Sequence, residues 1–203
     1  MCLLLHLDWT AAESDCACLS RKLKCGEEEE TCVIPSDLTN LLDPEATKLD
    51  LSDANLVGDL PNLCEAFPLL EVVLLDNNPK LNAGAVWEWL AECTSLRILS
   101  LYRTNRNGEM DAAIENLAPM KQTLHHLSLH DNPFTAGPVP SGLSRFTKMD
   151  QLRLSSTNRN GDLANATEIL APMSQTLQYL KLGKNPFTAG PVPSALSRFT
   201  KMI

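Results

Sequence analysis

The chain repeats itself at long range. Residues 104–149 return almost letter for letter as residues 157–202, an offset of 53 positions (157 − 104). The segments Leu-Ala-Pro-Met and Asn-Pro-Phe-Thr-Ala-Gly-Pro-Val-Pro-Ser occur in both copies. Self-similarity at a fixed spacing is typical of stacked units, each of which cannot bury its apolar face alone. The sequence therefore predicts a repeat protein whose neighbouring units share one continuous core.

A shorter period inside this unit marks six short strands. Pairs of apolar residues separated by one position recur at Leu49/Leu51, Val72/Leu74, Leu99/Leu101, Leu127/Leu129, Leu152/Leu154 and Leu180/Leu182. The steps are 23, 27, 28, 25 and 28 residues, so the long unit combines a 28-residue and a 25-residue repeat. Such alternation predicts strands with one buried face. Three places after each pair we expect residues that are small or that bond backbone groups of the turns: Ala54, Asn77, Thr104, Asn132, Thr157 and Asn185.

The sequence around these strands resembles that of the leucine-rich repeat proteins, and most closely their plant-type subclass. Residues 49–61 read Leu-Asp-Leu-Ser-Asp-Ala-Asn-Leu-Val-Gly-Asp-Leu-Pro, and residues 132–140 follow the same pattern with one inserted residue. Arg106 and Arg159 depart from it, because each stands where the subclass has leucine. The resemblance covers about residues 46–203. It implies an α/β fold, a right-handed solenoid of six leucine-rich repeats with a concave parallel β-sheet and short convex helices or turns.

The segments that return from one strand to the next carry helix signals. Short helices on the convex side are predicted at residues 83–93, 111–117 and 163–170. The Ala-Pro pairs at 118–119 and 171–172 are expected to end the last two, because proline cannot continue a helix.

Residues 1–45 differ from the repeats and are interpreted as an N-terminal cap. Four cysteines gather there, Cys16, Cys18, Cys25 and Cys32, with Trp9 upstream. This order resembles the cap of plant-type extracellular members, although the Trp-x-Gly-Val core of that cap is missing. The resemblance favours a disulfide-stapled cap with three possible pairings; a zinc site and reduced thiols are the alternatives. Cys64 and Cys93 lie inside repeats and are predicted to be small core residues.

The outward positions of the strands are the candidate ligand-binding surface, because they line one face rung upon rung. Unlike the leucines, these residues change chemistry at every rung. Val73, Leu75, Ile98 and Tyr102 are apolar or aromatic where solvent is expected, so they form a candidate hot spot. The remaining candidates on this face are Arg103, His126, His130, Arg153, Tyr179 and Lys181.

Charge divides the chain into unlike halves. Residues 1–98 hold 18 acidic and 6 basic residues (net −12), residues 99–203 hold 7 and 11 (net +4), and the sum is −8. This polarity favours a partner with complementary ends, or head-to-tail self-contact. It argues against nucleic acid, because the acidic half repels phosphates and the basic end lacks a dense patch.

Catalytic and metal-binding constellations are not found in the sequence. His125 and His126 point to opposite faces of a strand, and His126 and His130 lie about 13 Å apart at strand rise, too far for one metal ion. Phosphate loops and hydrolase or metalloprotease motifs are absent, so we expect no enzyme activity, no cofactor and no metal. The sequence contains no run of 18 apolar residues, and hence no membrane span.

The resemblance implies a function in recognition, in which the concave face binds a protein, peptide or cell-surface ligand outside the cell or at its surface. The alternative is a structural segment of a larger repeat protein or receptor kinase ectodomain; a cytoplasmic location is also open. Asn165-Ala-Thr is the one glycosylation sequon.

The C-terminal end of the sequence suggests a further interaction. Residues 201–203 align with residues 148–150, which immediately precede a strand, so the chain stops just before a seventh apolar pair. We expect further repeats, or self-association through this end with apolar surface exposed near Phe199.

Overall fold

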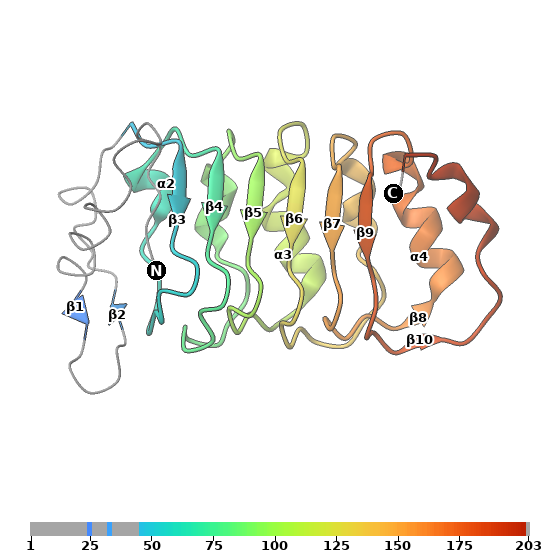
Figure 1. The fold of residues 1–203 in the computed structure, drawn as a ribbon, viewed down its shortest axis with the longest axis horizontal. Coiled ribbons are helices and arrows are strands. Elements are labelled where there is room, and N and C mark those ends of the chain that lie inside the picture. The colour runs from blue at the N-terminus through green and yellow to red at the C-terminus, as the bar shows by residue number, and fades with distance from the viewer. Residues whose placement is uncertain (1–23, 26–31, 34–44, 202–203) are drawn as a thin grey trace.

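The computed structural model describes residues 24–25, 32–33 and 45–201, and it shows a stacked solenoid (Figure 1). Its central element is a parallel six-stranded sheet in the order β3-β4-β5-β6-β7-β9. The strands are β3 (Lys48–Asp50), β4 (Val72–Leu74), β5 (Ile98–Ser100), β6 (His126–Ser128), β7 (Gln151–Arg153) and β9 (Tyr179–Lys181). Each strand pairs with its sequence neighbour, as the predicted repeat requires.

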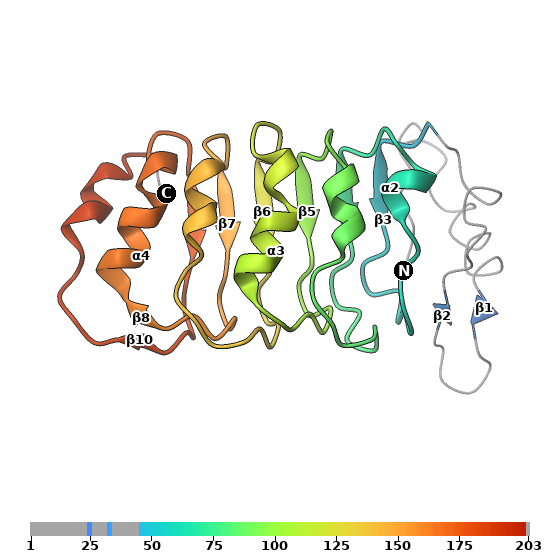
Figure 2. The same ribbon diagram turned by 180° about the vertical axis from the view of Figure 1, so that it is seen from behind.

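Short helices cover one of the two faces of this sheet (Figure 2). They are α2 (Leu63–Ala66), α3 (Met110–Asn116) and α4 (Leu163–Leu170), with the 3-10 segments η2 (Glu88–Glu92), η3 (Ala118–Met120), η4 (Ser141–Arg145), η5 (Ala171–Met173) and η6 (Ser194–Arg198). The helix predicted at 83–93 is a single 3-10 segment. Pro119 and Pro172 lie in the first turn of η3 and η5, where a missing N–H costs nothing, so they redirect the chain after each helix.

The core lies between these two layers. In the rungs from β3 to β7 the paired residues that point away from the exposed sheet face are at most 2% exposed, and Phe134 and Phe146 are buried beside them. The 3-10 turns and helices supply Leu90, Leu143 and Met173 from the opposite side. Because each rung contributes only a few apolar side chains, one continuous core runs the length of the described repeats.

The second rung corrects the predicted pairing by one residue. The register matches Val73 with Leu49 and Leu99, and both Val73 and Leu75 are fully buried. The pair of this rung is therefore Val73/Leu75 instead of Val72/Leu74. Residues 72–75 read Val-Val-Leu-Leu, so an alternating pattern fits either register.

Asparagine side chains close the turns after every second strand. Asn132 accepts the N–H groups of Thr104 (3.1 Å) and Arg106 (2.9 Å) on Oδ1. Its Nδ2 donates to the carbonyls of Leu101 (2.6 Å) and Leu129 (2.9 Å). Asn185 makes the same set of bonds one long unit later, and Asn78 takes this role in the second rung where Asn77 was predicted. The buried amides of Asn78 and Asn132 satisfy backbone groups that water cannot reach, and Asn185 is half-buried at the last rung.

Arginine fills the site where the plant-type pattern has leucine. Arg106 and Arg159 are 2% and 1% exposed. Each guanidinium donates to three backbone carbonyls, which for Arg159 belong to Thr157, Pro138 and Thr135. Burial lowers the pKa of Arg106 to about 10, against a smaller raising effect of Asp59, so the side chain stays cationic at neutral pH.

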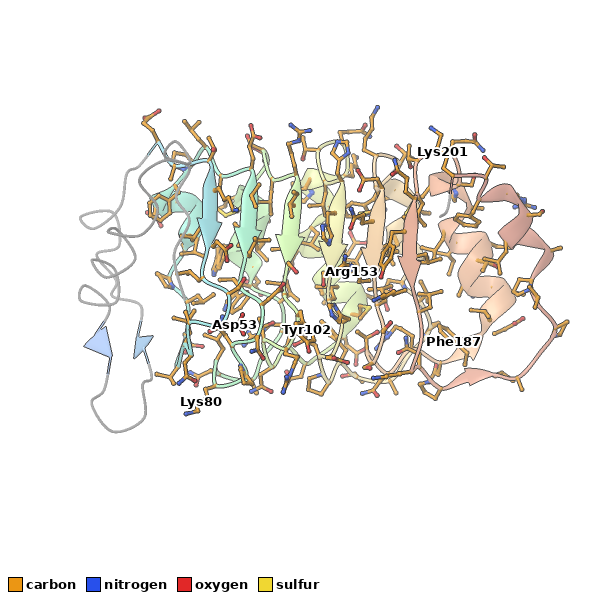
Figure 3. The ribbon with its side chains drawn as sticks, in the orientation of Figure 1. Asp53, Lys80, Tyr102, Arg153, Phe187 and Lys201 are labelled. Carbon is orange, nitrogen blue, oxygen red and sulfur yellow. A yellow bond between two sulfur atoms is a disulfide. The ribbon has the colours of Figure 1, made fainter. Side chains whose placement is uncertain are left out.

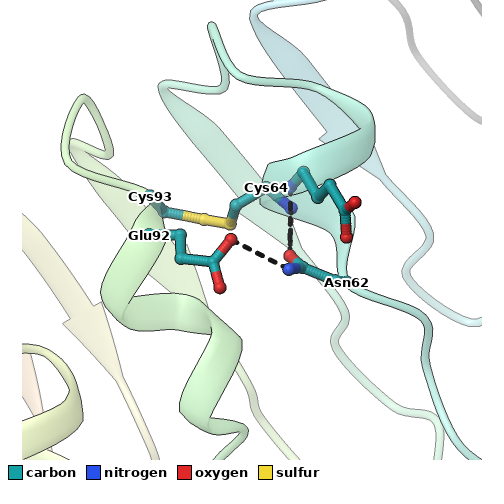
Figure 4. The surroundings of a disulfide bond; sticks show 5 residues. Asn62, Cys64, Glu92 and Cys93 are labelled. Atoms are coloured by element: carbon teal, nitrogen blue, oxygen red, sulfur yellow. Dashed lines mark hydrogen bonds between the residues drawn. A yellow bond between two sulfur atoms is a disulfide. The ribbon is translucent and has the colours of Figure 1, made fainter.

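Cys64 and Cys93 are buried, as predicted for small core residues, and they also form a disulfide with each other (Figure 4). Their Cα atoms lie 5.2 Å apart, within the range that disulfides require. The bond links α2 to the residue after η2, and Asn62 donates to Glu92 (2.9 Å) beside it. It therefore ties the first repeat to the second.

The two ends of the chain bear on further predictions. β1 (Lys24–Cys25) and β2 (Cys32–Val33) pair antiparallel with Cys25 opposite Cys32; Cys16 and Cys18 lie outside the described residues, so the stapled cap stays a prediction. Apolar surface was predicted near Phe199: this ring is itself only 5% exposed, whereas Val192 of the same repeat is 83% exposed. The last rung also leaves Leu180 and Leu182 half-buried. Self-association through this end stays a prediction.

Candidate functional site

The exposed side of the six-stranded sheet is the candidate site, and we call it the open sheet face. Each rung contributes four outward positions to it. The first reads Lys48, Val72, Ile98, His126, Gln151 and Tyr179; the second Asp50, Leu74, Ser100, Ser128, Arg153 and Lys181; the third Ser52, Asp76, Tyr102, His130, Ser155 and Gly183; the fourth Asp53, Asn77, Arg103, Asp131, Ser156 and Lys184.

Two predicted members of this face do not lie on it. Val73 and Leu75 point into the core, and Val72 and Leu74 replace them as half-buried outward residues. The other predicted residues, Ile98, Tyr102, Arg103, His126, His130, Arg153, Tyr179 and Lys181, all retain exposed surface. The predicted hot spot is thus an aliphatic strip on β4 and β5 that continues into Tyr102.

The fourth position turns the chain sharply and so fixes where the face ends. All six residues there adopt a left-handed backbone conformation, with φ between 50° and 58°. Asparagine and aspartate tolerate this region best, but Arg103, Ser156 and Lys184 adopt it too. The asparagine bonds to the carbonyls of the turn hold this geometry in place, since Asn78 also donates to Asp76 and Asn132 to His130.

Two aromatic rings stack on adjacent rungs in the middle of the face. The centroids of Tyr102 and His130 are 4.2 Å apart at an interplanar angle of 13°. Ser128 Oγ lies 2.7 Å from Nδ1 of His130, and Asp76 accepts the backbone N–H of Tyr102 (2.9 Å). Figure 3 shows Tyr102 below the end of its strand. We call the stacked rings of Tyr102 and His130 the ring ledge. It is pre-organised, because neighbouring polar groups form hydrogen bonds with both residues.

Cations gather on the last two strands of the sheet. The guanidinium carbon of Arg153 is 5.0 Å and the Nζ of Lys181 is 5.3 Å from the ring centroid of Tyr179. Arg153 also donates weakly to Gln151 (3.5 Å), while its buried Nε has no hydrogen-bond partner. Within the described part of the chain neither Arg153 nor Lys181 has a carboxylate within 4.0 Å. Their positive charge is therefore available to a ligand.

Two histidines share this environment. Burial, and secondarily the charge of Arg153, lowers the pKa of His126; Asp150 and Asp76 oppose this effect. Burial also lowers the pKa of His130, although Asp131 and Asp76 act in the other direction. Both rings favour the neutral form, and Nε2 of His126 is buried without a partner. Among the described residues no cluster of three metal-ligating side chains occurs, and none of their helices is long and apolar enough to cross a membrane.

The internal duplication shows which positions of the fold differ between two copies of one unit. The strand residues 98–103 and 126–131 align with 151–156 and 179–184. The four core leucines are identical between the copies, as are Thr104/Thr157, Arg106/Arg159 and Asn132/Asn185. By contrast, all eight outward positions differ: Ile98/Gln151, Ser100/Arg153, Tyr102/Ser155, Arg103/Ser156, His126/Tyr179, Ser128/Lys181, His130/Gly183 and Asp131/Lys184. Every outward position of the strands thus differs between the copies, whereas ten of the other 45 positions of residues 98–150 differ, six of them in residues 109–116.

Sequence reasoning missed some members of the face. Ser100 and Ser128 are almost fully buried beneath their neighbours, so their polarity gave no sign of a contact role. Gly183 has no side chain, so its chemistry does not mark it as a contact residue. Comparison of the two copies would have found all three, since each aligns with a residue of different chemistry.

Solved structures of plant leucine-rich repeat ectodomains match this fold. The ectodomain of the Arabidopsis thaliana receptor kinase GASSHO1/SCHENGEN3, in complex with CASPARIAN STRIP INTEGRITY FACTOR 2, aligns over 85% of this chain with 25% identity and a TM-score of 0.63. The ectodomain of the Arabidopsis receptor kinase HAESA, in complex with an IDA peptide hormone, aligns over 85% with 24% identity and a TM-score of 0.64. A plant ice-binding protein aligns over 70% with 22% identity and a TM-score of 0.58.

These alignments cover only part of the matched proteins. The chain spans 19% of the length of the first structure, 31% of the second and 42% of the third. No protein-family model and no curated protein sequence matches the chain. The parallel sheet, the convex helices and these matches together show a plant-type leucine-rich repeat solenoid.

Proposed function

We propose that this plant-type leucine-rich repeat protein is a non-catalytic recognition module, which binds a protein or peptide ligand on its open sheet face. One observation carries the proposal. Between the two internal copies, the inward leucines of the strands, the asparagine bonds and the buried arginines are kept, while all eight outward positions of the strands differ. A sheet whose inward leucines stay constant while its outward positions vary is suited to a tailored contact surface.

The chemistry of the face supports the same proposal. It offers the rings of Tyr102 and Tyr179 and the guanidinium groups of Arg103 and Arg153, and Tyr and Arg are enriched at the energetic centres of protein interfaces. Two of the matched structures are complexes with a peptide hormone or an integrity factor, so the fold accommodates such ligands.

An extracellular or cell-surface location is part of the proposal. The disulfide between Cys64 and Cys93 supports it, because disulfides persist in oxidising compartments. Asn165 supports it as well, since this sequon asparagine is exposed on α4, on the side opposite the open sheet face. A glycan there would leave the face free.

The test is a peptide-display selection on the purified protein, followed by affinity measurements with alanine variants. Tyr102→Ala is expected to cost about 2 kcal/mol of binding free energy, roughly a thirtyfold loss of affinity, because it removes half of the stacked pair. Arg145→Ala is the control, since this exposed side chain pairs with Glu115 on the helix side. Selected ligands whose affinity falls with Arg145→Ala and not with Tyr102→Ala would refute the proposal.

A further inference from the structure

The two internal copies place opposite chemistries at equivalent outward positions. In the first copy the third positions hold the rings Tyr102 and His130, and the second positions hold serines. In the second copy the third positions hold Ser155 and Gly183, and the second positions hold Arg153 and Lys181. Along the solenoid, the ring ledge of the first copy is followed in the second copy by small residues with two cations beside them.

The stack of Tyr102 and His130 is directed toward the space above these small residues. Its two rings lie 4.2 Å apart on adjacent strands, close to the spacing of about 4.8 Å between strands in a sheet. One side of His130 meets Tyr102, so its other side is directed toward the next rung, whose third position is Ser155. The rung after that has Gly183, where an added Cβ would have Ser155 Oγ as its nearest neighbour at 3.9 Å. Among the residues that the structure describes, no third aromatic ring stacks on this pair.

The cations beside this position have no anionic partner among the described residues. Arg153 and Lys181 both approach the ring of Tyr179, and no carboxylate in the described repeats pairs with them. Two like charges on adjacent strands repel each other, and an acidic ligand group between them removes this cost. Arg103, on the far side of the ring ledge, adds to the same sign of charge.

The spacing of the two features limits the ligand. The second and third outward positions of one rung are two residues apart, about 6.6 Å at strand rise. In an extended peptide, side chains separated by one residue point to the same side at this distance. An aromatic side chain over Ser155 and Gly183 thus places an acidic side chain two positions away against Arg153 and Lys181.

We propose that the open sheet face has a specific subsite for an extended peptide segment in which an aromatic residue and an acidic residue are separated by one position. The aromatic ring stacks on His130 above Ser155 and Gly183, and the carboxylate binds between Arg153 and Lys181. This inference rests on the proposed function, which it extends from a face to a ligand chemistry.

Fluorescently labelled twelve-residue peptides in a glycine-serine background test the inference by anisotropy. The probes contain Phe-Ser-Asp or Asp-Ser-Phe, and the matched controls are Leu-Ser-Asp, which lacks the ring, and Phe-Ser-Asn, which lacks the charge. At least one of the two probes should bind about tenfold tighter than either control. Equal affinity for all four peptides overturns the inference.

Two variants then locate the binding. Gly183→Leu fills the space beside Ser155 without straining the backbone, because the φ of Gly183 is not positive and its surroundings are open. Arg153→Gln removes one cation. Each variant should weaken the preferred probe about tenfold, whereas Ser52→Leu, at the third position of the first rung, should leave it unchanged. A probe that binds Gly183→Leu as tightly as the unaltered protein also overturns the inference.

The display selection separates this inference from the proposed function. Selected peptides that lose affinity with Tyr102→Ala and tolerate both Gly183→Leu and Arg153→Gln would overturn the subsite and leave the recognition face intact. A selection without any enriched aromatic and acidic pair overturns the subsite too, while the alanine variants still decide the proposed function.

Discussion

At the scale of single residues, the buried arginines show how one substitution reshapes a repeat. A leucine at position 106 or 159 would only fill space, whereas the guanidinium also donates to carbonyls of the preceding turn. Arg106 lies 4.1 Å from the ring centroid of Trp87, which adds a cation–π contact. Because the planar fork of arginine presents several donors at once, these two side chains replace water in the interior of the turn.

Arg159→Met should therefore destabilise the protein although methionine fits an apolar site. The buried carbonyl of Thr157 and the part-buried carbonyls of Pro138 and Thr135 lose a donor, and an unsatisfied buried group costs about 1–3 kcal/mol. We expect a loss of about 2 kcal/mol or more in the free energy of unfolding, measured by urea denaturation. Arg145→Met is the matched control, since this arginine is exposed in a surface ion pair worth about 0–1 kcal/mol. Equal losses for the two variants would contradict the role assigned to the carbonyl bonds.

The same scale explains where sequence reasoning failed. Alternation fixed the strands wherever polar residues separated the leucines, as in Leu127-Ser-Leu129. It failed at residues 72–75, because four apolar residues in succession fit both faces of a strand. The register was decided by contacts distant in sequence, namely the pairing of Val73 with Leu49 and Leu99 and the bonds from Asn78 to Leu51. The remaining candidate site residues could be predicted from the sequence, because an apolar, aromatic or charged side chain at an outward strand position is recognisable without a structure.

At the scale of elements, the disulfide joins two segments too short to be stable alone. α2 has four residues and η2 has five, and isolated helices of this length do not persist in water. Asn62 caps α2 by accepting the N–H groups of Cys64 (3.1 Å) and Glu65 (3.0 Å). The bond between Cys64 and Cys93 could not be predicted from spacing, because these two cysteines, 29 positions apart, come close only when two repeats stack.

Replacing both cysteines by alanine should loosen the first two repeats in particular. A loop of this length contributes about 3–4 kcal/mol through the entropy of the unfolded chain. In a solenoid each repeat contacts only its neighbours, so the loss should appear as faster amide exchange in α2 and η2, with β7 and β9 little changed. Exchange by mass spectrometry measures both regions in one experiment. A uniform increase along all six rungs would show that the disulfide has no local role.

At the scale of the whole molecule, the solenoid separates binding from support. The helix side carries paired charges between neighbouring repeats, Glu115 with Arg145 and Glu168 with Arg198, in equivalent positions of the two copies. The open sheet face carries the stacked rings and the cations that lack a partner. Stability is approximately a sum over the repeats and their interfaces. A change in a middle rung therefore affects its interfaces with the rungs on both sides. The two histidines with lowered pKa lie there, on or just after β6.

Acidification should therefore weaken the molecule at its centre. A histidine whose pKa is lowered by folding binds fewer protons in the folded state than in the unfolded state, so stability rises with pH across that interval. The contribution is complete above the ordinary histidine pKa of about 6.5 and is lost as the pH falls below it toward the folded value. We expect the free energy of unfolding to decrease from pH 7 to pH 5, where carboxylates are still largely ionised. The double variant His126→Gln, His130→Ser, which introduces residues found at the same positions of the next rung, should flatten this slope. Urea denaturation at several pH values measures it, and an unchanged slope in the double variant would assign the acid sensitivity elsewhere.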